Sequence, residues 1–135
     1  MATKIFVNLP VKELKKSIGF FTELGFSFNP QFTDENGTCM ILGEDSFVML
    51  IVEKFFKTFT EKEICDATKS TEAILALSAD SRNKVDEMVN KAIGAGGKTY
   101  REPQDQGWMY QRSFQDLDGH LWEIFFMDMS AMPQG

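Results

Sequence analysis

The chain has 135 residues, 43% of them hydrophobic, which fits one globular domain or two small units with a shared core and argues against disorder. Its net charge of -6 argues against a nucleic-acid partner, because phosphate binding needs clustered Lys and Arg. No apolar run is long enough to span a membrane, and the first residues lack a signal-peptide layout, so we expect a cytoplasmic protein with no membrane partner.

The first half of the chain predicts a strand, a helix and further strands. Residues 4–11, KIFVNLPV, are β-branched and aromatic, as in strands. In residues 12–26 the apolar side chains recur at spacings of four, three and three, which predicts one helical face. They are Leu14, Ile18, Phe21 and Leu24. Gly25 suits the left-handed position that ends a helix. Residues 26–52 then alternate apolar runs with turn residues, which predicts hairpins.

A charged connector, residues 54–71, follows, and its Thr60-x-x-Glu63 pattern is a capping box that would start a short helix. The two cysteines, Cys39 and Cys65, are far apart in the sequence and we expect reduced thiols. Cys39 lies in the apolar run TCMIL, which favours a buried small side chain over a reactive nucleophile.

The second half repeats the pattern of the first. Residues 73–79, AILALSA, predict a strand, and residues 80–97 carry apolar side chains at helical spacing. Asp80 or Ser81 is the expected N-cap, and the Gly94–Gly97 run is expected to end the helix rather than to bind phosphate. Residues 98–126 then read as further strands.

Aligning GEDSFVMLIV with DLDGHLWEIF places Leu50 against Glu123 and extends the repeat along the chain. We therefore predict an α+β fold with two βαβββ modules, residues 1–53 and 72–129, followed by a tail of residues 130–135. Curved mixed sheets would surround a cleft, with the helices outside.

Two motifs carry a family resemblance over nearly the whole chain. The stretches DLDGHLWEI and FVNLPVKELKKSIGFFTELGF resemble the glyoxalase, bleomycin-resistance and extradiol-dioxygenase group, the vicinal oxygen chelate superfamily. The resemblance implies the paired-module fold and a homodimer. It leaves the reaction open, because this fold hosts lyases, dioxygenases, epimerases, thiol transferases and drug-sequestering proteins.

In metal-dependent members of that group the resemblance implies four ligands, of the types His, Glu or Gln. Carried over to this chain, the positions are Phe6, Leu50, Ile74 and Glu123. Only Glu123 has a donor atom, although a slip of two residues would present Asn8 instead of Phe6. The single histidine, His120, falls in a turn and in opposite strand phase to Glu123. We therefore expect no catalytic metal and no cofactor.

Strand alternation predicts which side chains line the cleft with Glu123. The predicted set is Phe6, Asn8, Val48, Leu50, Val52, Ile74, Ala76, Ser78, Leu121 and Phe125, with Trp108 as an aromatic wall or interface residue. Glu123 is then a general base or a group that recognises a ligand amine or hydroxyl. Alternatively, Glu123 is held in place by a salt bridge to Arg112. Arg112 and Tyr110 are the expected partners of Glu123.

The predicted function is the binding of a small, partly apolar molecule in a mostly apolar cleft that lacks the metal. One alternative is a metal-dependent enzyme of the superfamily, a lactoylglutathione-lyase type or a dioxygenase, with an atypical site around Glu123. Another is a non-catalytic interaction protein whose cleft is filled by its own side chains.

Overall fold

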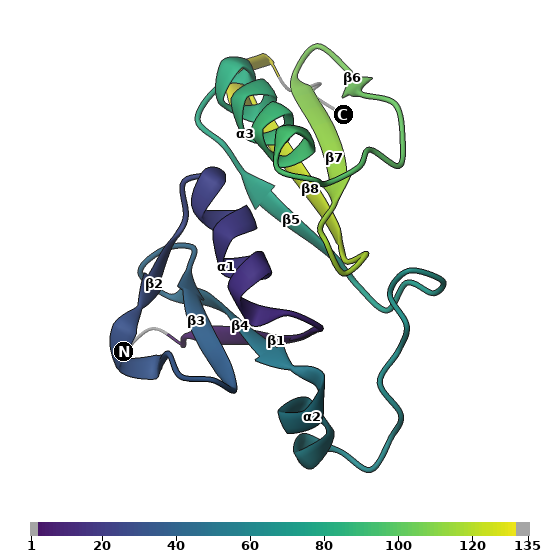
Figure 1. Cartoon of the computed structure of the whole chain (residues 1–135). Coiled ribbons are helices and arrows are strands. Elements are labelled where there is room, and N and C mark those ends of the chain that lie inside the picture. Colours follow the sequence, from purple (N-terminus) through teal and green to yellow (C-terminus); the bar gives the residue numbers. More distant parts are fainter. Residues whose placement is uncertain (1–2, 132–135) are drawn as a thin grey trace. The chain divides into compact units, whose positions relative to one another are not determined.

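The structure, a computed structural model, describes residues 3–131. The chain divides into two compact units, residues 1–66 and 67–135. Each unit contains one mixed four-stranded sheet and one long helix in the order βαβββ (Figure 1). The predicted α+β class and the repeat of the βαβββ unit are therefore confirmed.

The first unit has its strands in the order β1-β4-β3-β2, with β1 parallel to β4 and the other pairs antiparallel. Its elements are β1 (Ile5–Val11), α1 (Leu14–Glu23), β2 (Ser27–Asn29), β3 (Gly37–Ile41), β4 (Ser46–Val52) and α2 (Glu53–Phe56), which continues into a 3-10 turn, Lys57–Phe59.

Helix α1 packs against β4 through the face that the sequence predicts. Of the predicted face, Phe21 and Leu24 are buried and Leu14 and Ile18 are half-buried. Ser17 and Phe20, which were not in the predicted set, are buried as well. The helix ends at Gly25, whose φ of 101° is open to glycine, and the Phe26 amide donates to the Phe21 carbonyl at 3.1 Å. The predicted glycine cap is confirmed. Cys39 in β3 is buried, also as predicted.

The second unit repeats this arrangement with the order β5-β8-β7-β6, in which β5 runs parallel to β8. Its elements are β5 (Ile74–Ser78), α3 (Arg82–Gly94), β6 (Gln104–Asp105), β7 (Met109–Gln115), β8 (Leu121–Met127) and a final 3-10 turn, Met129–Ala131. Helix α3 packs on β7 and β8.

Both ends of α3 follow from local side-chain chemistry. The Ser81 side chain accepts a hydrogen bond from the Lys84 amide at 3.1 Å, which satisfies one of the free amides of the first turn. The helix stops where Gly96 adopts a φ of 111°, and the Gly97 amide donates to the Ala92 carbonyl at 2.8 Å. The glycine run is thus a helix terminus, as predicted.

The turn between β7 and β8 is organised by a buried carboxylate, Asp116. Its Oδ1 accepts the amides of Asp118 and His120, and its Oδ2 accepts the Trp122 indole N–H at 2.9 Å. Burial raises the pKa of Asp116, and the nearby His120 and these donors oppose that rise. Trp122 in turn stacks on Phe114 of β7, so the turn and the core are fixed together.

The connector differs from the prediction in one respect. Its helical residues, Glu53–Phe59, precede Thr60, whereas residues 60–73 form neither helix nor strand. The Thr60 hydroxyl accepts the Lys62 amide at 3.1 Å, so the capping-box threonine makes a local turn instead of starting a helix. Within residues 3–131, no helix is long and apolar enough to cross a membrane.

Candidate functional site

The side chains of β8 point alternately to a buried face and to a less buried one. Trp122 and Ile124 are fully buried on the side that α3 covers. Glu123 points to the opposite side, as the alternation predicts, and its neighbours across the sheet are Ser113 of β7 and Ala76 of β5. We call this side the Glu123 face. By strand register it comprises Ile74, Ala76, Ser78, Gln111, Ser113, Leu121, Glu123 and Phe125.

The cation beside Glu123 is Arg101, which the sequence analysis did not single out. Its Nη1 lies 3.3 Å from Glu123 Oε2. The Glu123 side chain is 14% exposed and that of Arg101 is 45% exposed, so the carboxylate is sheltered while its partner reaches solvent. Arg101 lies outside the strands, 22 residues before Glu123, where no periodicity indicates its position.

Arg112, the predicted partner of Glu123, forms its hydrogen bonds with other residues. It pairs with Ile124 across the sheet, which places its side chain on the α3 side. There it donates to Asp86 and Asn90 of α3, each at 3.0 Å. Tyr110, the other predicted partner, donates to Asp86 at 2.6 Å, and this hydroxyl is the largest cause of the lowered pKa of Asp86.

Two buried hydroxyl groups next to Glu123 have no hydrogen-bond partner of good geometry among the described residues: Tyr100 Oη and Ser113 Oγ. Burial raises the pKa of Tyr100, and the charge of the nearby Glu123 raises it further. An unsatisfied buried hydroxyl costs about 1–3 kcal/mol. Both residues line a pocket of about 370 Å³. Its lining also includes Arg101 and the residues around it, and Arg112, one of the predicted residues.

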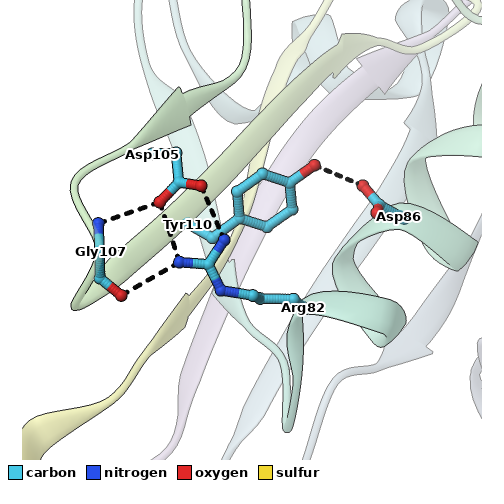
Figure 2. Close-up of polar contacts among 5 residues, drawn as sticks. All are labelled: Arg82, Asp86, Asp105, Gly107 and Tyr110. Atoms are coloured by element: carbon cyan, nitrogen blue, oxygen red, sulfur yellow. Dashed lines mark hydrogen bonds and ion pairs between the residues drawn. The ribbon is translucent and has the colours of Figure 1, made fainter. Parts of the chain in front are cut away.

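The segment that carries Tyr100 and Arg101 is fastened at both ends. Lys98 and Gln115 exchange two backbone hydrogen bonds, at 3.1 and 2.6 Å. At the other end, Arg82 holds Asp105 with two hydrogen bonds of 2.8 Å and donates to the Gly107 carbonyl at 3.0 Å (Figure 2). This arginine and, to a smaller extent, the Gly107 amide lower the pKa of Asp105 to about 2. The wall of the pocket is therefore set by an ion pair outside it.

Figure 2 also shows how α3 is tied to this segment. The Arg82 guanidinium lies over the Tyr110 ring, 5.1 Å from its centroid, while the Tyr110 hydroxyl reaches Asp86 one turn along α3. Side chains of α3 thus contact both β6 and β7.

In the first unit, the orientation of β4 differs from the prediction. Val48 and Leu50 are fully buried, whereas Met49 and Ile51 line a separate pocket of about 310 Å³ on the opposite side of the sheet. Asn8 lines that pocket too. Six of the seven residues of β4, SFVMLIV, are apolar. The sequence therefore contains no alternation that indicates which side chains face the core.

The remaining predicted residues fall as follows. Phe6, 48% exposed, stacks on Phe47 with ring centroids 4.8 Å apart. Ile74 is 49% exposed at the edge of its sheet, while Leu121 and Phe125 are half-buried on the Glu123 face. Trp108 is half-buried, and its carbonyl accepts the Asp128 amide at 2.7 Å.

These residues do not fit a divalent metal. Phe6 and Ile74 have no donor atom, and the Leu50 side chain is buried in the core. Its neighbour on the other face, Met49, offers only a thioether, a poor ligand for hard cations. Glu123 already lies against a guanidinium. Within residues 3–131, no three His, Cys, Asp or Glu side chains gather closely enough to hold a metal ion.

The paired βαβββ units, each with one helix on its sheet, define an α+β protein of two repeated modules. Residues 5–124 match the model of the Glyoxalase/Bleomycin resistance protein/Dioxygenase superfamily, and the chain belongs to this superfamily. The resemblance noted in the sequence is confirmed. The search of curated proteins found no match.

Solved structures with the same fold include a hypothetical protein from S. aureus, 32% identical, with a TM-score of 0.78 and coverage of 93% of this chain and 95% of that one. A glyoxalase-related enzyme from Fulvimarina pelagi is 18% identical, with a TM-score of 0.78 and coverage of 100% and 94%. The fosfomycin resistance protein FosX from Listeria monocytogenes is 17% identical, with a TM-score of 0.65 and coverage of 96% and 97%. The last two likenesses concern the fold alone.

Proposed function

We propose that this protein binds a small, partly apolar molecule on the Glu123 face, with Glu123 as the polar anchor. The observation that carries the proposal is the pair of buried hydroxyls, Tyr100 Oη and Ser113 Oγ, which lie near each other and near a sheltered carboxylate but make no hydrogen bond of good geometry among the described residues. Proteins rarely leave such groups unsatisfied, and a ligand amine or hydroxyl supplies the missing hydrogen bonds. Ile74, Leu121 and Phe125 give the same face its apolar surface.

Glu123 and Arg101 divide the recognition between them. A ligand amine or hydroxyl donates to Glu123, while Arg101, which is nearly half exposed, is free to turn toward an acceptor on the ligand. Members of the superfamily include enzymes, and the same carboxylate would serve as a general base if the ligand is a substrate.

The proposal is tested by a thermal-shift screen of aromatic and amphipathic metabolites. A ligand at about 100 times its dissociation constant adds about 2.7 kcal/mol to the free energy of unfolding, so a strong hit is easily seen. Glu123→Gln keeps the size of the side chain and removes the charge, and we expect it to weaken binding of a hit roughly tenfold or more.

The matched control is Glu87→Gln, the same change at a half-exposed position on α3 that pairs with Lys84 and Lys91. It should leave the affinity unchanged. A broad screen without any stabiliser, or equal affinities in the two variants, would refute the proposal.

A metal-dependent activity is tested separately by elemental analysis of the purified protein. We expect Zn, Ni, Mn and Fe well below one ion per chain, because the four superfamily positions supply a single oxygen donor. A stoichiometric metal that disappears in Glu123→Ala would establish the metal-dependent enzyme in place of the simple binding protein.

We further propose that the protein acts in the cytoplasm as a homodimer. The dimer rests on its common occurrence in the superfamily. The two free cysteines, Cys39 and Cys65, support the reducing environment of the cytoplasm.

A further inference from the structure

The first unit carries a second pocket that the proposed function does not use. It is the pocket of about 310 Å³ beside β4, with Met49 and Ile51 on the sheet side. Three phenylalanines also line it: Phe32, Phe55 and Phe59. Their exposed fractions are 60%, 40% and 52%, so each ring is partly open to solvent. We call this the Phe pocket.

Two of the three rings of the Phe pocket pack against each other. Phe55 and Phe59 come from α2 and the 3-10 turn after it, one helical turn apart, and meet edge to face at 5.2 Å with an angle of 73°. Phe32 comes from an earlier segment of the chain, the 3-10 turn between β2 and β3. Phenyl faces carry a negative quadrupole and attract cations within about 6 Å.

The charge of the lining has one sign. Asp34 is its only ionisable side chain, and no Lys, Arg or His lines the pocket. Asp34 Oδ1 accepts the amides of Asn36 and Gly37 at 2.8 and 3.2 Å, which holds the carboxylate in a fixed place on the rim. Such a lining disfavours an anion, and Asn8 and Gln31 make it too polar for a plain alkyl chain.

We propose that the Phe pocket binds a small organic cation, an alkylated ammonium group, by contact with the rings of Phe55 and Phe59 and by attraction to Asp34. The acidic balance of the whole chain favours the same sign of ligand. The residues of the Phe pocket belong to the first unit, whereas Glu123 belongs to the second.

The test compares choline with 3,3-dimethyl-1-butanol, which has the same shape without the charge, by titration of the full chain followed by amide NMR. We expect saturable shifts around the Phe pocket with choline and at least about tenfold weaker binding of the neutral alcohol. Phe59→Leu keeps an apolar side chain without the ring and should weaken choline binding roughly threefold to thirtyfold. Asp34→Asn keeps the acceptor of the turn and should weaken it several-fold.

The matched control is Phe6→Leu, a change at another exposed phenylalanine of the same unit that does not line the pocket. It should bind choline as the native chain does, and thermal melts show that each variant is folded. Equal binding of the neutral alcohol, no binding of either probe, or loss of self-association in Phe59→Leu without any choline effect would overturn the proposal. Loss of choline binding in Glu123→Gln would do so too, because the cation would then lie on the Glu123 face.

Discussion

The hydroxyl groups of Tyr100 and Tyr110, both in the second unit, differ in their hydrogen bonding. Tyr110 donates to Asp86 at 2.6 Å, whereas Tyr100 Oη is buried near Ser113 and Glu123 without a hydrogen bond of good geometry. Protein stability gains from the first and loses from the second, because a buried hydroxyl is favourable only when it is paired. A fold keeps such a cost when the group serves binding, which is why Tyr100 supports the proposed site.

Tyr100→Phe should therefore leave the free energy of unfolding unchanged or raise it by up to about 1 kcal/mol. The same variant should bind the ligand found in the thermal-shift screen more weakly. Tyr110→Phe, the same chemical change, should lower it by about 1–2 kcal/mol because it breaks a bond to a carboxylate. Urea unfolding of both variants measures the difference. Equal losses in the two would mean that Tyr100 is hydrogen-bonded in solution.

The residues around Glu123 also show which partner a carboxylate acquires. Arg112 is eleven positions nearer to Glu123 in the sequence than Arg101 is, but its strand register turns it to α3. Arg101 lies outside any strand and is free of that constraint. Proximity in sequence thus misleads when alternation and register decide the direction of a side chain.

At the scale of elements, the turn from β7 to β8 depends on Gly119. Its φ is 91°, and a Cβ there would lie 2.9 Å from the backbone of Ala67 and Thr68. Both the backbone conformation and the space therefore exclude other residues.

Gly119→Ala should lower the free energy of unfolding by about 2 kcal/mol or more. Gly25→Ala is the matched control, since Gly25 has a similar φ of 101° with nothing within 4 Å of the added Cβ. It should cost only about 1–2 kcal/mol of conformational strain. Thermal or urea unfolding separates the two contributions, and a smaller loss at Gly119 than at Gly25 would contradict this account.

The Arg82–Asp105 pair fastens β6 to the start of α3 and predicts a dependence on pH. The folded pKa of Asp105, about 2, lies below its ordinary value of 3.8, so its contribution to stability is present above about pH 4 and lost as the pH falls toward 2. In Arg82→Met that contribution should be missing. The difference in free energy of unfolding between native chain and variant should then shrink between pH 4 and 2. A constant difference would mean that the pair does not form in solution.

At the scale of the whole molecule, the chain is two copies of one βαβββ plan that have diverged in chemistry. The second unit has polar groups around Glu123, and the first has the rings of the Phe pocket. Repetition therefore preserved the fold while the faces of the two sheets changed, as expected when function lies in side chains placed on a common frame.

We predict that the native chain is a homodimer, and sedimentation equilibrium should give twice the chain mass at micromolar concentration. The exposed apolar side chains at the first strand of each sheet, Ile5, Phe6 and Ile74, are consistent with surfaces that a partner covers. If the Ile5→Lys variant also has twice the chain mass, Ile5 lies outside the interface. A monomeric mass for the native chain would contradict the dimer.

Sequence patterns alone predict the two βαβββ units, the glycine ends of both long helices, the buried Cys39 and the direction of Glu123. Each of these depends on local patterns: helical spacing, glycine at positive φ, or the alternation around Trp122 and Ile124. Tertiary structure alone decided the phase of β4, where Met49 and not Leu50 faces the pocket, because an all-apolar strand has no periodicity to read. It also decided that Arg101 and not Arg112 meets Glu123, since the pairing of β7 with β8 sets which side chains share a face.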